Sequence, residues 1–521
     1  MTDEPREEKR TQTSGASAIP AREIEVKLEA APAILRDAFT LAPFAGATLL
    51  RGRTCATTYF DTPDNALSRA GMALRVRRTG RRRIMTFKWP ARDAQGAFAR
   101  GELEAVIHAD SPDPQLLGAE VAALIAETTG GLPLEPRSQT IFRRRIATIE
   151  RDGALIEAAL DRGRILAEAR KAHIAELELE IKRGDPAALF DFASALTDHG
   201  FRVAAAPKGL RGHWLATGEG PSETRAIAPA LSRDMPLDDA IAAILDANLG
   251  QFVANWPALS PDCPEAVHQM RVALRRLRSA LGLFNKAMPC ESFARFRAEA
   301  KRIASAMGDA RDQDVIRELI EHGPAQALGY ETRFEPLLKA SARKRAAAYR
   351  NVRTLIESPE TSRFVLELQA AIARRAWRAG DEIEPALGAP EFARRALDRL
   401  DRRARKRGKG LVRLAPEQRH EARIALKNLR YAADFFSSLF GRGKDAKRFG
   451  RAIGDLQDAL GAYNDAIVAR TIVAQIEKAA GAPAARAAGA VDGWTARGAV
   501  DADGHLGASW KAFRKAPRFW K

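Results

Sequence analysis

The first regular pattern along the chain is the stretch EIEVKLEA at residues 23–30, in which charged and apolar side chains alternate strictly. Successive side chains of a β-strand point to opposite faces. Glu23, Glu25 and Lys27 therefore share one face of a predicted strand, and the apolar side chains between them share the other. A solvent-facing surface would explain this pattern in a single strand, so its meaning depends on the segments that follow.

Similar strand-like segments continue to about residue 215 and are separated by turn-forming residues. Two apolar stretches, at about 115–127 and 187–199, interrupt them and are predicted as helices. Eight strand segments joined by turns predict an all-β sheet or barrel. After EIEVKLEA, the segments are ATTYFDTPD, MALRVRRTG, IMTFKWP, ARGELEAVI, IFRRRIATIERDG, ALIEAALDRGRI and AELELEIKRGD.

The second half of the chain has a different periodicity. Its apolar residues follow helical spacing almost to the C-terminus, in a sequence rich in Ala, Leu, Arg and Glu. Residues 480–505, rich in Ala, Gly and Asp, are predicted to form a flexible stretch before a final amphipathic segment. The predicted divisions are a disordered tail at 1–20, a β domain at 21–215, a linker at 216–234, a helical domain at 235–475 and a C-terminal extension at 476–521.

The net charge of +18 is distributed unevenly along the 521 residues. Residues 1–220 contain 32 Lys and Arg against 30 Asp and Glu, whereas residues 221–521 contain 52 against 36. Nearly all the excess positive charge therefore belongs to the helical half. Such an imbalance predicts a polyanionic partner, which could be polyphosphate, nucleic acid or an anionic membrane.

Composition narrows the remaining classes of protein. A chain of 521 residues with 46% hydrophobic residues can form two to four domains with cores of their own. Three scattered cysteines are too few for a disulfide framework or a zinc site. No run of eighteen uncharged apolar residues and no export signal is found. We therefore expect a cytoplasmic protein that does not enter a membrane.

The other predicted strands repeat the charged face of the first. Arg75 and Arg77 alternate in one strand, and Glu176, Glu178 and Glu180 alternate in another. Solvent-facing strands usually mix in Ser, Thr and Gln, so this segregation favours a barrel with its charged faces inside. Buried charges are costly unless they are paired or bind ions. Further charged positions with this alternation are Lys88, Arg100, Glu102, Glu104, Arg143, Arg145, Glu157 and Asp161.

A lumen of this composition indicates a particular chemistry. Clustered carboxylates bind hard divalent cations such as Mg²⁺ or Mn²⁺ through oxygen. Arg and Lys bind phosphate oxygens, and the guanidinium fork matches the geometry of a phosphate group. The charged faces therefore predict a site for a divalent metal and a polyphosphate.

At these positions the sequence resembles the CYTH family, the triphosphate tunnel metalloenzymes. EIEVK matches the family's E-x-E-x-K signature, and later blocks follow in the family's order over residues 21–215. The resemblance implies an antiparallel eight-stranded tunnel that binds a triphosphate and a divalent metal, Mg²⁺ or Mn²⁺. It implies hydrolysis of the triphosphate or, in some members, cyclisation of ATP. The later blocks are YFDTPDNALSRAGMALRVRR, TFKWP, ALDRGRI, AELELEIKRGD and APKGLRG.

The resemblance also implies roles for individual residues of the tunnel. Glu23, Glu25 and Lys27 would form the catalytic set. The metal ligands would be Glu23, Glu25, Asp161 and two of the three glutamates Glu176, Glu178 and Glu180. The phosphate-binding residues would be Lys27, Arg75, Arg77, Lys88, Arg143, Arg145, Lys208 and Arg211.

The helical half contains an internal repeat. The segments HQMRVALRRLRSAL (268–281) and HEARIALKNLRYAA (420–433) each carry a histidine followed by basic residues at offsets of three, seven and ten. On a helix these positions lie on one side, opposite the leucines that face the core. A single basic stripe would be ordinary solvent-facing surface, but its duplication favours a binding surface. The two stripes are His268, Arg271, Arg275 and Arg278, and His420, Arg423, Lys427 and Arg430.

This repeat resembles the CHAD family over residues 235–475, and the block GDARDQDV, which contains Arg311, adds to the resemblance. The family implies two four-helix bundles related by pseudo-twofold symmetry, with a basic groove or pore that binds inorganic polyphosphate through the two stripes and Arg311. It also implies a bacterial cytoplasmic setting, and we expect association with polyphosphate granules. With the tunnel, the predicted fold class is α+β multidomain: an eight-stranded antiparallel β-barrel followed by an all-α domain.

The sequence therefore predicts a metal-dependent inorganic triphosphatase, or short-chain polyphosphatase, with a helical domain that binds polyphosphate. Two alternatives stay open: a non-catalytic polyphosphate-binding or targeting protein, and adenylyl cyclase or thiamine triphosphatase activity in the same tunnel. A nucleic-acid partner is disfavoured because the stripes contain almost no aromatic residues for base stacking, and aromatics are 7% of the chain. The sequence leaves the preferred metal, the chain length and the oligomeric state open.

Overall fold

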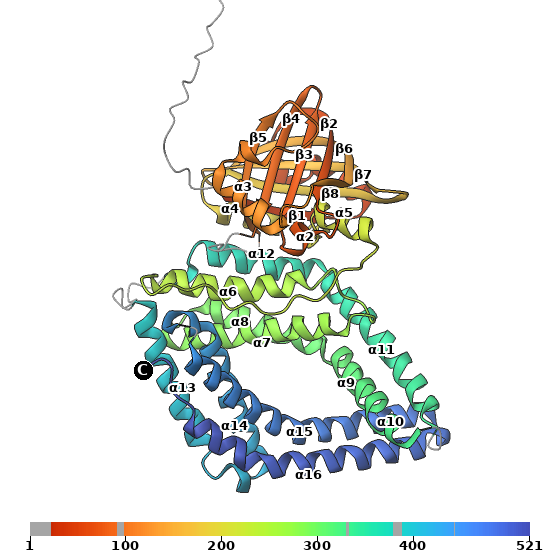
Figure 1. Cartoon of the computed structure of the whole chain (residues 1–521), viewed down its shortest axis with the longest axis vertical. Coiled ribbons are helices and arrows are strands. Elements are labelled where there is room, and N and C mark those ends of the chain that lie inside the picture. The colour runs from red at the N-terminus through yellow and green to blue at the C-terminus, as the bar shows by residue number, and fades with distance from the viewer. Residues whose placement is uncertain (1–21, 91–97, 330–332, 379–387, 442) are drawn as a thin grey trace, which may run out of the picture.

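Figure 1 shows a computed structural model of the chain, in which a β-barrel sits against one side of a larger helical domain. The predicted order of a β domain followed by a helical domain is confirmed. The predicted disordered tail at 1–20 lies outside the described residues. The structure describes residues 22–90, 98–329, 333–378, 388–441 and 443–521.

The N-terminal domain is a closed antiparallel barrel of eight strands, as predicted. The strands follow the order β5-β4-β3-β2-β6-β7-β8-β1, and pairing between β5 and β1 closes the sheet. The short strand β9 adds to the edge of β1. The strands are β1 Arg22–Glu29, β2 Thr48–Asp61, β3 Ala73–Thr79, β4 Arg82–Trp89, β5 Ala99–Ile107, β6 Glu135–Arg151, β7 Ala154–Ala167, β8 Arg170–Arg183 and β9 Arg202–Val203.

Short helices pack on the barrel, and both predicted ones are present as α3 and α4. Helix α5 lies close against β6, β7 and β8, because glycines on it leave room for barrel side chains. A Cβ atom at Gly212 would lie 2.4 Å from Ser138 Oγ, and one at Gly209 would lie 2.7 Å from the ring of Tyr59. These helices are α1 Pro32–Arg36, α2 Ala66–Arg69, α3 Ala119–Thr129, α4 Pro186–Thr197 and α5 Lys208–Thr217.

The described part of the C-terminal domain is mainly helical, and its helices together form a ring-shaped outline in Figure 1. Among the described residues, none of the helices is both long and apolar enough to cross a bilayer. The helices are α6 Leu237–Ala254, α7 Pro264–Ala287, α8 Glu291–Ala306, α9 Gly308–His322, α10 Pro324–Leu328, α11 Glu335–Ile356, α12 Pro359–Ala373, α13 Ala389–Arg407, α14 Pro416–Phe436, α15 Lys444–Ala480 and α16 Ala485–Lys515.

Contacts between the two repeats show pseudo-twofold symmetry. The histidines of the two repeats are 152 residues apart, at 268 and 420. Pro236, which precedes α6, forms a β-bridge with Gly388, its own counterpart 152 residues later at the start of α13. Where α7 meets α14, Ser279 contacts Asn428 at 3.4 Å. At the spacing of 152 residues, Ser279 corresponds to Tyr431 and Asn428 corresponds to Arg276. These two counterparts also contact each other, because Arg276 lies over the ring of Tyr431. Reciprocal contacts of this kind define a twofold relation between two surfaces.

The long helices α15 and α16 correct the prediction of a flexible stretch at 480–505. Residues 485–515 form the continuous helix α16, which packs along α15. Its small side chains Ala487 and Ala488, together with Val491, are buried in a second apolar cluster with α9, α11 and the end of α15. Alanine and glycine favoured a flexible interpretation of the sequence. In the structure the same small residues permit close packing of two helices.

The barrel and the helical domain share one apolar core. Helix α4 of the barrel domain packs against α12 of the helical domain. At this contact, Arg363 of α12 donates a hydrogen bond to Thr197 Oγ1 at 3.0 Å and pairs with Asp198. Ser362 Oγ accepts a hydrogen bond from the backbone N–H of Val203 at 2.9 Å. Because β9 pairs with β1, the helical domain supports the strand that carries the EIEVK signature.

Candidate functional site

The lumen of the barrel is a charged cavity of about 490 Å³. Its lining confirms the inward charged faces, because side chains from β1, β3, β4, β7 and β8 contribute to it. The alternating apolar side chains of β1, Val26 and Leu28, are fully buried on the outer face of the barrel, in the shared core. Of the predicted site residues, those lining the lumen are Glu23, Glu25, Lys27, Arg75, Arg77, Lys88, Glu178, Glu180 and Lys208.

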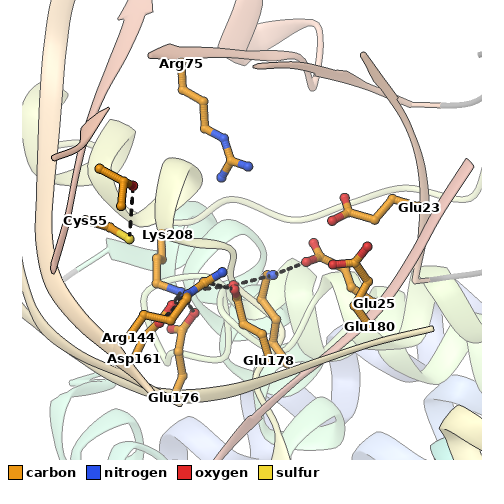
Figure 2. Close-up of polar contacts among 12 residues, drawn as sticks. Glu23, Glu25, Cys55, Arg75, Arg144, Asp161, Glu176, Glu178, Glu180 and Lys208 are labelled. Carbon is orange, nitrogen blue, oxygen red and sulfur yellow. Dashed lines mark hydrogen bonds and ion pairs between the residues drawn. The ribbon is translucent and has the colours of Figure 1, made fainter. Parts of the chain in front are cut away.

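One side of the lumen is a row of carboxylates (Figure 2). Glu25 of β1 is directly opposite Glu180 of β8, which is directly opposite Glu157 of β7. Glu23 lies two residues before Glu25 on the same face of β1. Carboxylates that face one another on adjacent strands destabilise the sheet. We call Glu23, Glu25, Glu157 and Glu180 the carboxylate row; the sequence shows the alternation at Glu157 but predicts no role for it.

The pKa values reflect the crowding of these acids. Burial raises the pKa of Glu23, and the neighbouring carboxylate of Glu25 raises it further. Burial also raises the pKa of Glu180, with further contributions from Glu23 and Glu157 that Lys182 opposes. Glu25 differs: burial would raise its pKa, but the ammonium groups of Lys27 and Lys88 lower it to about 2. The row therefore favours a positive charge.

Lysines supply that charge in the protein itself. Lys27 Nζ lies 2.7 Å from Glu25 and 2.7 Å from Glu178. Lys88 pairs with Glu23 and lies 3.3 Å from Glu102. Although burial opposes its charge, the carboxylates around Lys27 raise the pKa of its ammonium group. The lysines predicted to bind phosphate are therefore engaged with the predicted metal ligands.

The opposite side of the lumen is a basic wall of Arg75 and Arg77 on β3. Figure 2 shows Arg75 extending into the lumen across from the carboxylates. The buried Nε atoms of Arg75 and Arg77, and the hydroxyl of Thr57 beside them on β2, have no hydrogen-bond partner among the described residues. Arg75 lowers the pKa of Arg77, with burial and Arg144 acting in the same direction. Arg75 also lies 3.6 Å from Glu102 through its terminal nitrogen, but the unpaired Nε donors and the crowded positive charge at Arg77 favour an anion at this wall.

Beneath the lumen lies a network of buried ion pairs that we call the salt-bridge floor. Arg144 donates two hydrogen bonds to Asp161, at 2.7 and 2.6 Å, and one to Glu178 at 2.5 Å. Lys208 of α5 lies 2.7 Å from Asp161 and 2.6 Å from Glu176. Buried charges need such partners, since a lone buried charge would be strongly destabilising.

The floor changes the roles predicted for two acids. Asp161 is 0% exposed and Glu176 is 2% exposed, and neither lines the lumen. The expectation that they are metal ligands therefore does not match their positions, because both lie behind the lumen lining, where Arg144 and Lys208 pair with them. They hold Arg144 and Lys208 in place. Arg211 of α5 has a similar position outside the lumen, where it pairs with Glu176 at 3.1 Å.

The arginines of β6 correct a second expectation. Arg143 and Arg145 are exposed on the outer face of the barrel, and Arg144 between them points inward. Arg145 donates a hydrogen bond to the backbone oxygen of Arg36 at 3.1 Å and lies over the ring of Phe39. In a run of three arginines the alternation cannot tell which face is inside. The cross-strand partner of Arg144 is Asp161. Asp161 alternates in phase with Glu157, and this phase could have indicated that Asp161 and Arg144 both point inward.

The carboxylate row suits a hard divalent cation in its chemistry, because all its donors are carboxylate oxygens and its charge is incompletely balanced. The raised pKa values of Glu23 and Glu180 point the same way. Within the described part of the chain, no three His, Cys, Asp or Glu side chains already surround one metal position. The residues fit a cation that replaces the ammonium groups now beside the carboxylates.

The helical domain brings the first basic stripe next to α9. The side chains of His268, Arg271, Arg275 and Arg278 are half-buried on α7, and the buried Nε atoms of Arg275 and Arg278 lack a partner among the described residues. Burial lowers the pKa of His268 to about 4, and Arg311 of α9 and the arginines of its own stripe add to this effect. Arg311 therefore lies near His268 of this stripe.

Arg297 of α8 is a cation of this surface that the sequence did not single out. The Nε of Arg297 packs against Gly282, which lies on α7 four residues after Arg278. A Cβ atom added at Gly282 would be 3.1 Å from that Nε. After burial, Arg297 is the largest cause that lowers the pKa of Arg278. Its contribution depends on the packing of α8 against α7, so helical spacing within one segment could not reveal it.

The second stripe lies on α14. Arg423, Lys427 and Arg430 are half-buried, whereas His420 is exposed at the start of the helix. Arg430 donates a hydrogen bond to Gln457 of α15 at 3.1 Å. Because α7 and α14 are in contact, the two stripes lie on neighbouring helices.

Comparisons with known families cover both domains. The family model of the CYTH domain matches residues 21–200, and that of the CHAD domain matches residues 243–474. An inorganic triphosphatase of Haemophilus influenzae is 31% identical over 202 residues, which span 38% of this chain and 55% of that protein. An uncharacterized protein of Mycobacterium tuberculosis is 25% identical over 430 residues, or 77% of this chain and 79% of the relative.

Two solved structures each match more than half of this chain. A crystal structure of the CHAD domain from the plant Ricinus communis covers 57% of this chain and 99% of that one, with 28% identity and a TM-score of 0.47. PptA from Streptomyces chartreusis covers 54% of this chain and 99% of its own, with 18% identity and a TM-score of 0.39.

Proposed function

Because this chain contains a CYTH domain followed by a CHAD domain, we propose that its tunnel hydrolyses inorganic triphosphate with a divalent metal and that its helical domain binds inorganic polyphosphate. The observation that carries the first part is the division of the lumen. A basic wall with unpaired donors lies across from a row of crowded carboxylates. A metal–triphosphate complex has the complementary arrangement of charge, because its phosphate oxygens are anionic and its metal is cationic.

The basic wall would hold and polarise the phosphates. Arg75 and Arg77 present guanidinium groups whose Nε donors have no partner among the described residues. Phosphoryl transfer depends mainly on positioning and on stabilising charge at the phosphate oxygens. Donors that are largely buried in a cavity serve that purpose better than flexible surface side chains. The Arg144–Asp161 and Lys208–Glu176 pairs of the salt-bridge floor would fix the base of the site.

The carboxylate row would hold the metal, with Glu23, Glu25 and Glu180 as its nearest oxygen donors. When bound, Mg²⁺ or Mn²⁺ supplies positive charge that offsets the negative charge of the phosphate oxygens. Lys27 and Lys88, released from their carboxylates, could then turn their ammonium groups to the phosphates. Each cationic side chain would exchange a carboxylate partner for a phosphate partner.

An inorganic substrate fits the lumen better than a nucleotide. Nucleobase binding uses open aromatic faces for stacking. Phe142 in the lining has Lys208 5.2 Å and Arg144 5.4 Å from its ring centre, so its face is covered. Phe60 is 8% exposed, which leaves Tyr59 and the imidazole of His213 as the partly accessible rings of the described lining. The relative from Haemophilus influenzae, named an inorganic triphosphatase, supports the same choice.

The test is phosphate release by the purified full chain. Triphosphate, longer polyphosphates, ATP and thiamine triphosphate are compared with and without Mg²⁺ or Mn²⁺. We expect triphosphate hydrolysis that requires the metal and that falls on the order of 100-fold or more in Glu23→Gln/Glu25→Gln. The matched control is Glu127→Gln/Glu150→Gln, which removes two exposed carboxylates outside the lumen. Parent-level turnover by the lumen variant would refute the tunnel site.

The proposal for the helical domain is supported by the two basic stripes on adjoining helices. Half-buried arginines with unpaired Nε donors, as at Arg275 and Arg278, favour an anionic ligand. Duplication of the stripe suits a ligand that repeats the same charged unit. A long polyphosphate could contact both stripes, so each would raise the local concentration of chain at the other.

Binding of long-chain polyphosphate by the full chain tests this part. Replacing Arg271, Arg275 and Arg278 with Gln should weaken binding, and combining this set with Arg423→Gln, Lys427→Gln and Arg430→Gln should remove most of the affinity. Affinity should also fall steeply with salt, as in other associations between basic proteins and polyanions. Single-stranded DNA and RNA at equal phosphate concentration serve as competitors. Equal competition by nucleic acid would argue against polyphosphate as the ligand.

The same measurements separate the non-catalytic alternative. A chain that binds triphosphate and polyphosphate but releases no phosphate with any of these metals would be a binding or targeting protein. Cyclic AMP formed from ATP would instead indicate cyclase activity in the tunnel.

A further inference from the structure

Helix α13 differs from its symmetry counterpart α6 at one set of positions. The two helices begin at equivalent points, since Pro236 and Gly388 pair across the pseudo-twofold axis. Corresponding positions of the two helices are 152 residues apart. On one face, α6 has small or neutral residues at the positions where α13 has basic ones. The residues of α6 are Ala247, Gly250, Gln251 and Ala254, and those of α13 are Arg399, Arg402, Arg403 and Lys406. We call the latter four the outer basic face.

The packing of the two helices explains why this face is free in only one copy. Helix α6 packs against both α7 and α12 and is buried on most sides. Helix α13 buries one side only, through residues such as Phe392, Ala396 and Leu397. Arg402, Arg403 and Lys406 are exposed. In Figure 1, α13 lies along the outer edge of the helical domain.

The outer basic face is a concentrated positive charge. Residues 399–413 contain eight Lys and Arg and a single acid, Asp401. Asp401 is buried and already pairs with Arg405 and Arg518, at 2.8 Å each. The four cations of the outer basic face form no ion pair with any carboxylate that the structure describes, and the same is true of Lys409 and Arg413, which continue the positive charge past the helix.

Exposure alone does not account for this composition. Neutral polar or mixed charged residues would keep the face soluble, whereas like charges at helical spacings of three and four residues destabilise the helix. Attraction to the negative end of the helix dipole reaches only the last turn, which includes Lys406 but not Arg399 or Arg402. The stripe from 399 to 406 is about 10 Å long on one side of the helix. Its geometry therefore fits an extended anionic ligand.

The surroundings of the face select among polyanions. Single-stranded nucleic acid needs exposed aromatic platforms, but the tryptophans nearby are turned into the fold: Trp520 is 1% exposed, and Trp510 packs where a side chain on Gly408 would be. Membrane binding by an amphipathic helix gains much of its strength from a buried apolar face, and α13 places its apolar face in the core, which leaves charge alone for a membrane. A flexible chain of phosphates needs only charge.

We propose that the outer basic face of α13 is a second contact for inorganic polyphosphate, separate from the stripes of α7 and α14. This inference rests on the proposed polyphosphate-binding function of the helical domain. Helix α13 packs against α14, and Arg407 at its end pairs with Glu421 near the start of α14. A polyphosphate long enough to extend from the α14 stripe over the outer basic face would contact both, whereas a shorter one would contact only one of them. The second contact thereby makes affinity increase with chain length.

The test compares two variants of the full chain that lose the same charge. One is Arg399→Gln/Arg402→Gln/Arg403→Gln/Lys406→Gln. The control is Arg162→Gln/Arg164→Gln/Lys171→Gln/Arg183→Gln, which removes four exposed cations from the outer side of the barrel. Glutamine keeps good helix propensity, and circular dichroism verifies folding. The readouts are the affinity for long-chain and short-chain polyphosphate, its dependence on salt, and triphosphate hydrolysis.

We expect the α13 variant to bind long-chain polyphosphate on the order of tenfold more weakly, with a salt dependence reduced by about three units of log–log slope for four lost contacts. Short-chain binding and triphosphate hydrolysis should match the parent, and the control should match it in every assay. Equal losses in both variants, or no loss in the α13 variant, would overturn the second contact while leaving the proposed function in place. Failure of the parent to bind polyphosphate would instead refute that function.

Two further probes distinguish other polyanions. Duplex RNA and vesicles of phosphatidylglycerol are offered to the parent and the α13 variant under the same conditions. We expect weaker binding of both probes than of polyphosphate by the parent. If the substitutions reduce binding to either probe more than binding to polyphosphate, the face serves that macromolecule and our assignment is wrong.

Discussion

Arg144 shows how a single position separates the inside of the barrel from the outside. Side chains of a strand alternate, so Arg143 and Arg145 must point away from the lumen if Arg144 points into it. Arg144 binds Asp161 through two hydrogen bonds, and both partners are buried. A buried ion pair contributes little as a pair, but removing one member leaves the other charge without a partner.

Neutral substitutions along this run should therefore have unequal effects. Arg144→Gln should destabilise the protein by about 3–5 kcal/mol, because the buried carboxylates of Asp161 and Glu178 would lose their shared guanidinium partner and keep only lysines beside them. Arg143→Gln should change the free energy of unfolding by less than about 1 kcal/mol, as is usual for an exposed position. Urea unfolding of the two variants measures both values. Similar destabilisation at the two positions would contradict the inward placement of Arg144.

The lysine–carboxylate pairs of the lumen predict that metal and triphosphate bind cooperatively. Metal alone must displace ammonium groups such as that of Lys27, and triphosphate alone must draw these groups away from Glu25 and Glu178. Bound together, the two ligands provide new partners for both sets of charges. Calorimetric titrations should therefore show that Mg²⁺ tightens triphosphate binding on the order of tenfold, with the reciprocal effect of equal size. Independent affinities would contradict this exchange of partners.

His268 makes polyphosphate binding dependent on pH. Burial and neighbouring arginines lower its pKa to about 4 in the free protein, so it is neutral at pH 6 and above. A polyanion bound beside it would raise that pKa. At any pH between the pKa of His268 in the free protein and its pKa in the complex, binding would therefore be accompanied by uptake of a proton. Affinity should increase as the pH falls through this window, and His268→Gln should flatten the dependence between pH 7 and pH 4. An unchanged profile would show that His268 does not face the ligand.

At the scale of secondary structure, α16 shows that composition is a weak guide where packing decides. Its glycines reduce intrinsic helix propensity, yet the helix continues to Lys515 because it lies along α15 for much of its length. Gly489 and Gly493 have open space where a Cβ would be, whereas a Cβ at Gly212 of α5 would collide with Ser138. Glycine is dispensable in the first setting and required in the second.

Gly489→Ala and Gly493→Ala should each stabilise the protein by up to about 1 kcal/mol, because alanine loses less conformational freedom in a helix. Gly212→Ala should destabilise it, because helix α5 would have to move away from the barrel. Thermal unfolding of the three variants checks the two signs. If alanine at 489 and 493 has no stabilising effect, residues 485–515 are not the stable helix described here.

At the scale of the whole molecule, the two domains are joined by a continuous apolar core and by hydrogen bonds from α12. The contact between Ser362 and Val203 matters beyond its own energy, because β9 pairs with β1. The strand that carries Glu23, Glu25 and Lys27 is therefore supported from the helical domain. Such an arrangement predicts unfolding of both domains as one cooperative unit.

Calorimetry of the full chain should show a single transition that triphosphate with Mg²⁺ shifts to higher temperature as a whole. Ser362→Ala leaves a buried N–H without its partner, which should cost about 1–3 kcal/mol and lower the transition temperature. Two well-separated transitions, with only the first responding to triphosphate, would mean that the domains unfold independently.

Much of this architecture could be predicted from the sequence, because local patterns determine it. Alternation in EIEVKLEA and in the other segments identified the strands and the inward face for Glu23, Glu25, Arg75 and Lys88, since the period of a strand is two residues. The repeated histidine-headed stripes identified α7 and α14, since helical spacing places their basic residues on one side. The order of the two domains followed from the change along the chain from the two-residue period of strands to helical spacing.

The tertiary structure decided which charges pair and which stay available. Asp161 and Glu176 alternate correctly for metal ligands, but Arg144 and the lysine of α5 reach them from other parts of the chain and occupy their oxygens. Likewise, the sequence marks α6 and α13 as helices but does not say that α12 covers only the first. Pairing, burial and exposure depend on residues distant along the chain, and so they are set by the packed fold rather than by any local pattern.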